Sequence, residues 1–264
     1  MKRIVLPLFL MLCMASCKKM FLYHPDEIRP DETSLNAKNI AKLAAIPAKP
    51  SYKFILIGDT QRFYEELDDF VSFVNSRDDI TFVILDGDLT DFGLNREYNW
   101  VAERLNKLKV PVIAVLGNHD MLANGTTIFR KMFGPENFTF RYGGSKFIAL
   151  NTNSRESDFD GTVPDIHWLN AEVEDDADYN ALFVISHVAP FSGDFDHNLE
   201  QPYRETLEAS PKLRASLHAH EHSYNLSQPY EDDIDYLLVG STGTRNYALI
   251  TVDGGKHTIE EKHY

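Results

Sequence analysis

The sequence predicts an α/β fold in which two packed β-sheets carry helices on their outer faces. Three observations support this class. Short, unbroken apolar runs, typical of strands buried on both faces of a sheet, alternate with helical patterns after residue 50, and two hairpin patterns follow later in the chain. With 264 residues, 43% of them hydrophobic, the chain is long enough to bury the core of one full domain.

The first elements are three strand–helix units. In chain order, their strands and helices are expected at 53–58, 63–76, 81–86, 96–109, 111–116 and 126–133. Three such units in succession predict parallel strands that are joined by right-handed crossovers.

The later elements change this order. Two hairpins, one helix and two single strands are expected at 138–142 with 146–150, 245–252 with 257–262, 164–175, 182–185 and 234–239. Gly143-Gly144 and Asp253-Gly254-Gly255 separate the halves of the hairpins, and hairpins favour such turn residues. Late antiparallel strands beside early parallel ones predict mixed sheets.

The first seventeen residues have the layout of a secretion signal. Lys2 and Arg3 precede the apolar stretch Ile4–Met14, which is too short to span a bilayer, because a spanning helix needs about twenty residues. Since Met14-Ala15-Ser16-Cys17 resembles a lipobox, Cys17 is expected to become the lipid-modified N-terminus of a protein in the bacterial cell envelope that faces the periplasm. An ordinary signal peptide, which would leave a secreted soluble protein, is the alternative.

Residues 18–50 are polar and contain four prolines, and they are expected to form a tether with a short helix over 34–46. The folded domain is expected over 51–264. Both cysteines of the chain, Cys13 and Cys17, lie in the signal segment, so the domain can form no internal disulfide.

The formal net charge of −14 argues against a general nucleic-acid binder, which needs a basic surface to neutralise phosphates. No nucleic acid duplex is therefore expected as a partner, and membrane contact is expected only through lipid on Cys17. An anionic substrate would need local positive charge, which bound metal ions would supply.

Five short polar clusters follow apolar runs or, in the last case, a strand-like segment. They are Asp59-Thr60-Gln61, Gly87-Asp88-Leu89-Thr90-Asp91, Gly117-Asn118-His119-Asp120, Ser186-His187 and His220-Glu221-His222. Because ligands bind beyond the carboxyl ends of strands in open α/β sheets, these side chains are expected to converge. Carboxylates and imidazoles suit Mn²⁺, Fe or Zn²⁺, so the clusters predict one two-metal site.

In order along the chain, the clusters resemble the motif blocks of the calcineurin-like metallophosphoesterase family, which are Asp-x-His, Gly-Asp-x-x-Asp, Gly-Asn-His-Asp/Glu, a lone His and Gly-His-x-His. The resemblance runs from about residue 52 to the C-terminus. It implies a four-layer αββα sandwich and a metal-dependent phosphoester hydrolase that acts on a small phosphorylated substrate. Gln61 and Ala219 depart from the blocks, where the family usually has His and Gly.

The resemblance also implies a role for each site residue. One divalent cation would be held by Asp59, Gln61, Asp88 and His222, and a second by Asp88, Asn118, His187 and His220. A hydroxide that bridges the two cations would attack phosphorus in line. His119 would protonate the leaving oxygen as general acid, and Asp91 would orient His119.

Gln61 bears on the metal and on the function. An amide oxygen is a weaker donor than imidazole, so Mn²⁺ is the expected metal, with Fe, Zn²⁺ or Mg²⁺ as alternatives. Gln61 also supports a rival hypothesis, a metal-binding envelope lipoprotein without turnover, whereas the intact pair of His119 and Asp91 favours an enzyme. Within the enzyme class, the alternative is a nucleotide phosphodiesterase or pyrophosphatase.

Three further predictions concern the surroundings of the site. Arg245 is a candidate for contacting phosphate. His218 has the strand parity to face the same side as His220 and His222, and it is expected to pack near the site or to contact one of the ligand residues. Substrate specificity is expected in the loops at 119–137, 153–162 and 189–204.

Overall fold

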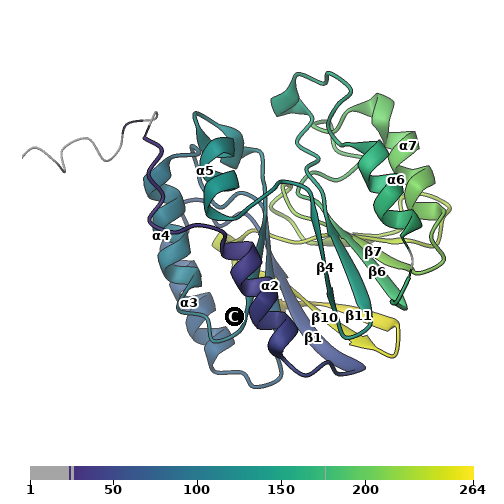
Figure 1. The fold of residues 1–264 in the computed structure, drawn as a ribbon, viewed down its shortest axis with the longest axis horizontal. Helices are drawn as coiled ribbons and strands as arrows, with labels where there is room; N and C mark the ends of the chain where they lie inside the picture. Colours follow the sequence, from purple (N-terminus) through teal and green to yellow (C-terminus); the bar gives the residue numbers. More distant parts are fainter. Residues whose placement is uncertain (1–23, 25–26, 176) are drawn as a thin grey trace, which may run out of the picture.

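Two β-sheets lie face to face in the computed structural model, which describes residue 24 and residues 27–175 and 177–264 (Figure 1). The expected signal segment 1–17, with Cys17, lies outside the described residues. Among the helices of the described ranges, none is both long enough and apolar enough to cross a membrane.

The first sheet has five strands in the order β11-β10-β1-β2-β3. Their bounds are Lys256–His263, Asn246–Asp253, Ser51–Ile57, Phe82–Asp86 and Val112–Val115. β1, β2 and β3 are parallel, as the three strand–helix units predict, whereas β10 is antiparallel to both of its neighbours. The carboxyl ends of the three parallel strands therefore lie at one edge of this sheet.

The second sheet has six strands in the order β4-β5-β6-β7-β9-β8. Their bounds are Phe138–Tyr142, Ser145–Ala149, Ala181–Ile185, Leu213–His218, Asp235–Leu238 and Asn225–Ser227. The four central strands are parallel, and the edge strands β4 and β8 are antiparallel to their neighbours. Both predicted hairpins, β4 with β5 and β10 with β11, are confirmed.

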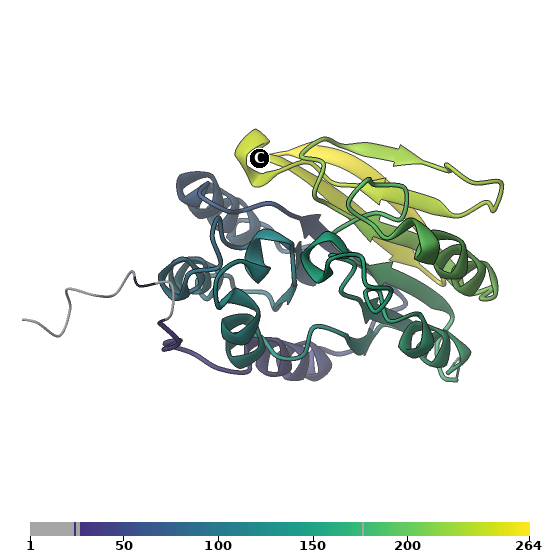
Figure 2. The same ribbon diagram turned by 90° about the horizontal axis from the view of Figure 1, so that it is seen from above.

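Helices cover the outer face of each sheet (Figures 1 and 2). On the first sheet lie α3 (Tyr64–Asn75), α4 (Asn95–Leu105) and α5 (Gly125–Met132), and on the second lie α6 (Ile166–Glu174) and α7 (His197–Glu208). A further apolar core fills the space between the sheets. The predicted αββα sandwich is therefore confirmed.

Successive side chains of a strand point to opposite faces of its sheet, so one strand contributes both to the core between the sheets and to the core under the helices. In β1, Phe54 points between the sheets and Ile55 packs under the helices. The Phe54 ring stacks on Phe82 of β2, with centroids 5.0 Å apart, and meets Phe183 of β6 edge-on at 5.7 Å. Because these rings join strands of both sheets, they fix how the strand ends of one sheet lie against those of the other.

Residues 189–204 are predicted as a loop, but helix α7 begins at residue 197. The sequence signal is hidden by Pro202 inside the helix, because proline lacks a main-chain donor and usually ends a helix. Asp196 caps the first turn by accepting from the main-chain N–H of Asn198 at 3.0 Å. Burial of Tyr203 against the second sheet favours the helix despite the proline.

The helix expected within the tether is present as α2 (Leu35–Ala45) and packs beside the edge strand β3. The Asn36 side chain donates to the Ala114 carbonyl at 2.8 Å and accepts from the Ala114 N–H at 2.9 Å. Upstream, the main chain of Arg29 makes the same kind of paired contact with the Asn95 side chain on α4. From residue 27 onward, the segment predicted as a tether is therefore packed against the domain.

We expect Asn36→Ala to lower the free energy of unfolding by about 2 kcal/mol or more, because two buried main-chain groups of Ala114 would each lose a partner worth roughly 1–3 kcal/mol. Urea unfolding followed by circular dichroism would measure this. Lys38→Ala, at an exposed position of the same helix, is the control and should change stability by less than about 0.5 kcal/mol. Equally small effects for both variants would show that α2 is only loosely attached.

Candidate metal centre

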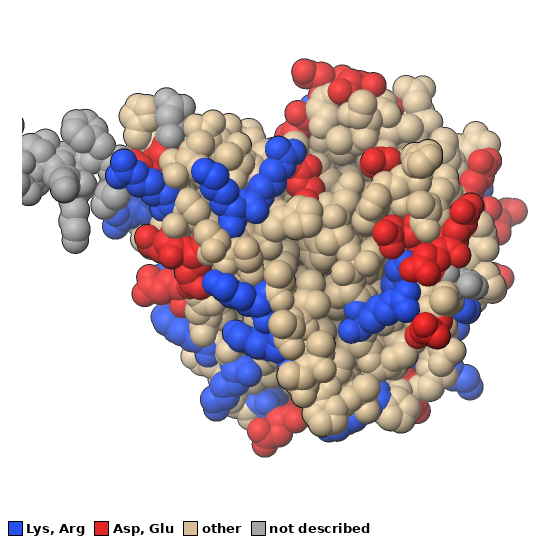
Figure 3. Space-filling model, viewed as in Figure 1, with Lys and Arg blue, Asp and Glu red and all other residues tan. Residues whose placement is uncertain are grey.

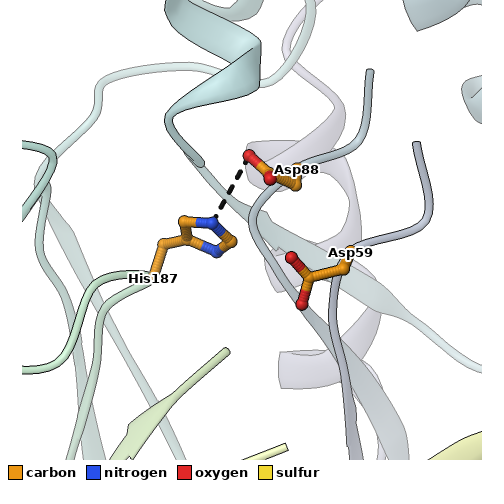
Figure 4. Close-up of side chains that lie close together, drawn as sticks. All are labelled: Asp59, Asp88 and His187. Carbon is orange, nitrogen blue, oxygen red and sulfur yellow. Dashed lines mark ion pairs between the residues drawn. The ribbon is translucent and has the colours of Figure 1, made fainter. Parts of the chain in front are cut away.

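Five parallel strands bring the predicted ligands to one place. Asp59, Asp88 and Asn118 follow β1, β2 and β3 of the first sheet, whereas His187 follows β6 and His220 and His222 follow β7 of the second. Three of them, Asp59, Asp88 and His187, are buried, and one ligand atom of each lies within 4.8 Å of the other two (Figure 4). The predicted convergence of the strand ends is therefore confirmed.

The four residues expected at the second cation form a continuous chain of contacts. His187 Nε2 lies 3.4 Å from Asp88 Oδ1 and 3.1 Å from Asn118 Oδ1. His220 Nδ1 lies 3.0 Å from the same amide oxygen. Ligand atoms that are about 2.1 Å from a cation and at right angles to each other stand about 3 Å apart, so these side chains have the spacing of a coordination shell.

The residues expected at the first cation are less completely arranged. His222 Nε2 lies 3.1 Å from Asp59 Oδ1. Gln61, however, donates a hydrogen bond from Nε2 to Asp88 Oδ2 at 3.0 Å, so its amide nitrogen faces the shared carboxylate. A half-turn of the terminal amide would present the oxygen as a ligand, because the two ends of an amide have nearly the same shape.

The charges of the cluster fit divalent cations. Asp59 Oδ1 is buried, and its neighbour is His222 Nε2 at 3.1 Å. Burial opposes the charged form of His187, but Asp88 outweighs this effect and raises the pKa of His187 to about 10. Burial likewise opposes ionisation of Asp88, but His187 and the neighbouring His119 hold the pKa of its carboxyl below the usual range. A proton on His187 therefore supplies, in the metal-free protein, the positive charge that a cation would bring.

Five of the seven expected ligands have left-handed main-chain conformations. They are Asp59, Gln61, Asp88, His220 and His222, with φ of 53°, 30°, 53°, 70° and 53°. This conformation costs energy in residues other than glycine, and such strain gathers at functional sites. The described ranges contain twelve non-glycine residues of this kind, so five at one site mark it as the main place where the chain accepts strain.

Two glycines let the ligand-bearing turns approach each other. A Cβ atom on Gly117 would overlap the main-chain nitrogen of Asp88, and a Cβ atom on Gly87 would overlap the His187 ring. Any larger residue at either position would push the shared carboxylate and the imidazole apart.

Asp120 ties the second polar cluster to the third. Its buried carboxylate accepts hydrogen bonds from the N–H groups of Leu89, Thr90 and Gly117 at 3.1, 2.9 and 3.0 Å, and from the Thr90 hydroxyl at 2.9 Å. These four bonds fix the turn that carries Asp88 against the turn that carries Asn118. Asp120 is therefore a structural member of its motif and not a ligand.

His119 lies beside the cluster with 37% of its side chain exposed. Its Nδ1 donates to the main-chain carbonyl of Asp91 at 2.8 Å, whereas the Asp91 carboxylate is 3.9 Å from that nitrogen and 3.6 Å from Arg62. Since a carbonyl can only accept, Nδ1 carries a hydrogen and Nε2 remains for a substrate. Asp91 thus orients His119 through its main-chain carbonyl, which accepts this hydrogen bond, and not through its carboxylate.

Arg245 does not join the cluster. Its guanidinium pairs with Asp69 of α3 at 2.6 Å and lies over the ring of Tyr264, 5.8 Å from the centroid. The charge of Arg245 is therefore engaged between α3 and the C-terminus.

His218 is fully buried beside the cluster. Its Nδ1 lies 2.8 Å from the Ser186 carbonyl and its Nε2 lies 2.9 Å from Ser216 Oγ. Burial lowers the pKa of His218 to about 3, so the ring is neutral at physiological pH. His218 packs behind the Ser186-His187 segment, as the sequence predicts.

Asp194 contacts the cluster although the sequence gives no reason to select it. It lies in the loop between β6 and α7, and its Oδ2 is 3.1 Å from His220 Nε2. No motif spacing surrounds it, because its neighbours are Gly193, Phe195 and the cap residue Asp196. Only the approach of this loop to His220 in the fold reveals the contact.

The surface is uneven in charge (Figure 3). Lys and Arg side chains lie over α2 and α5, whereas acidic side chains gather on the lobe that carries α6 and α7, across the notch at the top of the view. The loop before α6 contributes Glu156, Asp158 and Asp160. These acidic side chains disfavour large polyanions as partners, because like charges repel.

Comparison with known proteins agrees with this geometry. The profile of the family described as calcineurin-like phosphoesterase matches residues 52–224. The match covers more than half of the chain and includes all seven expected ligands.

Three curated relatives are similar over part of their length. The uncharacterized protein YvnB of Bacillus subtilis is 26% identical over 203 residues, which are 67% of this chain and 16% of YvnB. A probable cyclic nucleotide phosphodiesterase of Ruthia magnifica is 29% identical over 152 residues, 54% of this chain and 63% of that protein. A second probable cyclic nucleotide phosphodiesterase, from Fibrobacter succinogenes, is 29% identical over 127 residues, which are 44% of this chain and 47% of that protein. The chain spans less than two thirds of each relative.

Solved structures share the fold. A dimetal phosphatase from Danio rerio has a TM-score of 0.63 at 13% identity, over 80% of this chain and 96% of that chain. A purple acid phosphatase from yellow lupin seeds has a TM-score of 0.61 at 13% identity, over 81% of this chain and 52% of that chain. At such low identity, these likenesses establish the fold alone.

We expect the affinity for Mn²⁺ to rise about tenfold per pH unit between pH 6 and 8, because a cation must displace the proton that His187 holds with a pKa of about 10. Calorimetric titration in buffers of different ionisation enthalpy would count the released protons. Binding without proton release over this range would contradict the ligand role of His187.

We expect His222→Gly to be about 1 kcal/mol more stable than His222→Ala in the presence of a chelator, because glycine adopts the left-handed conformation without cost. The His222 side chain is 45% exposed, so both truncations lose little packing. Urea unfolding of the two variants would compare them. Equal stabilities would mean that this position is not strained.

Proposed function

Since the chain belongs to the calcineurin-like phosphoesterase family, we propose that it is a metal-dependent hydrolase of small phosphorylated substrates. The observation that carries the proposal is the buried cluster of Asp59, Asp88 and His187, with His119 beside it. A protein that only binds metal needs the ligands but has no use for a proton donor. The rival hypothesis of a metal-binding module without turnover is therefore the weaker one.

Two groups of residues would hold the cations. Asp59, Asp88, His222 and the turned amide of Gln61 would hold one, and Asp88, Asn118, His187 and His220 the other. When bound, such ions neutralise phosphoryl oxygens and activate water for attack. We propose Mn²⁺ as the metal, because Gln61 offers a weaker donor than imidazole.

His119 is proposed to protonate the leaving oxygen. The Asp91 carbonyl holds Nδ1–H, so a proton on Nε2 can be passed to the substrate. The Asp91 carboxylate lies 3.9 Å from the same Nδ1. The main-chain N–H of His119 also donates to Asp88 Oδ1 at 2.9 Å, so the acid and the shared carboxylate are held together by one hydrogen bond.

Nucleotide phosphodiesters are the second candidate class of substrate. Two relatives with 29% identity are described as probable cyclic nucleotide phosphodiesterases, which supports this class. Turnover of a cyclic nucleotide and of bis(p-nitrophenyl) phosphate, compared with p-nitrophenyl phosphate and pyrophosphate in the presence of Mn²⁺, would separate diesterase, monoesterase and pyrophosphatase activity.

We also propose that the protein is anchored in the bacterial envelope by lipid on Cys17, facing the periplasm. The lipobox-like sequence Met14-Ala15-Ser16-Cys17 supports this proposal. Mass spectrometry of the mature N-terminal peptide would test it. A lipid adduct on Cys17 is the expected result, and an unmodified N-terminus at another residue would favour the secreted alternative.

We expect His119→Ala to lower kcat by about 10²- to 10⁴-fold for substrates with a poor leaving group, and by much less for p-nitrophenyl phosphate, because a good leaving group needs no proton. Metal analysis should show the same Mn²⁺ content as in the wild type. His167→Ala, at an exposed position outside the cluster, is the control. A His119→Ala enzyme that is equally fast on both substrate types would contradict the role as acid.

A further inference from the structure

The two ring nitrogens of His220 have different partners. Nδ1 faces the cluster, 3.0 Å from Asn118 Oδ1, and Nε2 lies 3.1 Å from Asp194 Oδ2. The two side chains are mostly buried, with exposed fractions of 16% for His220 and 15% for Asp194. Asp194 does not belong to the expected ligand set, so this contact has no role in the function proposed above.

Asp194 is itself held in place from a second loop. Arg155, in the segment after β5, places Nη2 2.6 Å from Asp194 Oδ1, and its main-chain N–H donates to the Asp194 carbonyl at 3.2 Å. The Asp194 carboxylate thus has one oxygen on an arginine and the other on His220. A carboxylate paired with arginine can only accept, so the hydrogen of a neutral His220 ring lies on Nε2.

We propose that Asp194 is a positioning residue for His220, which it holds in the tautomer whose Nδ1 lone pair faces the second cation. This inference rests on the proposed function. Ligating histidines commonly donate their other ring N–H to a carboxylate, which fixes the orientation of the ring and raises its basicity. His220 needs such a contact more than His187 does, because His187 is fully buried and its Nδ1 is already held by the Asp86 carbonyl at 2.7 Å.

The contact between Asp194 and His220 also links two loops to the metal site. The loops that contain Arg155 and Asp194 are expected to select the substrate, and here they also fix a metal ligand through an Arg155–Asp194–His220 chain. Changes in these loops would therefore alter metal affinity as well as specificity.

The test is Mn²⁺ binding to the full chain carrying Asp194→Ala or Asp194→Asn. Asp194→Ala should weaken one of two Mn²⁺ sites by about 10- to 100-fold and leave the other unchanged. Asp194→Asn keeps a neutral acceptor and should recover part of this loss. Asp69→Asn is the matched control, because Asp69 makes an ion pair of the same 2.6 Å length with Arg245 away from the cluster, and it should bind Mn²⁺ as the wild type does.

Electron paramagnetic resonance supplies a readout that a merely structural role would not move. With two equivalents of Mn²⁺, the wild type should show the signal of a coupled pair, and Asp194→Ala should show isolated Mn²⁺ until the metal is in excess. Excess Mn²⁺ should then restore kcat to within a few-fold of the wild type.

Two results would overturn the inference in distinguishable ways. Two Mn²⁺ sites of wild-type affinity in Asp194→Ala would overturn the positioning role alone. A wild-type protein that binds no divalent cation would overturn the proposed function, and the inference with it.

Discussion

The whole arrangement depends on two carboxylates, Asp59 and Asp88, being buried where the ends of two sheets meet. Bare charges in such a place are costly, and a partner of opposite charge is required. The partner comes from the other sheet as His187, which is anchored to the main chain of Asp86. The sheets are therefore joined by charge at their ends as well as by aromatic rings between their faces. The same demand for positive charge suits the site to divalent cations.

Around this centre, acidic residues that are not expected ligands hold the ligands and His119 in position. Asp120 holds two turns together through four hydrogen bonds, and Asp194 reaches His220 from a loop. The main chain of Asp91 orients His119. Together with the left-handed turns, these contacts hold the ligands in strained positions that the chain would not adopt unaided. Order at the site is thus supplied by contacts within the fold itself.

Much of this could be predicted from the sequence, because apolar runs of strand length and the polar residues directly after them are local signals. The parallel strands, both hairpins and the convergence of Asp88 with His187 follow from such signals. Features that depend on tertiary contacts could not be predicted. Pro202 conceals α7, whose stability comes from packing. Arg245 binds Asp69 because α3 happens to lie nearby, and Asp194 acts across a loop that has no periodicity.

The contact of Asn36 with Ala114 has a consequence beyond stability. β3 is the last strand of its sheet, and an uncovered edge strand offers unpaired main-chain groups to any passing chain. The side chain of Asn36 occupies such groups, while β11 at the opposite edge carries charged residues such as Lys256 and Glu260. Proteolytic clipping near α2 would expose a template for strand addition between molecules. Helix α2 thus protects this edge of the sheet from pairing with another chain.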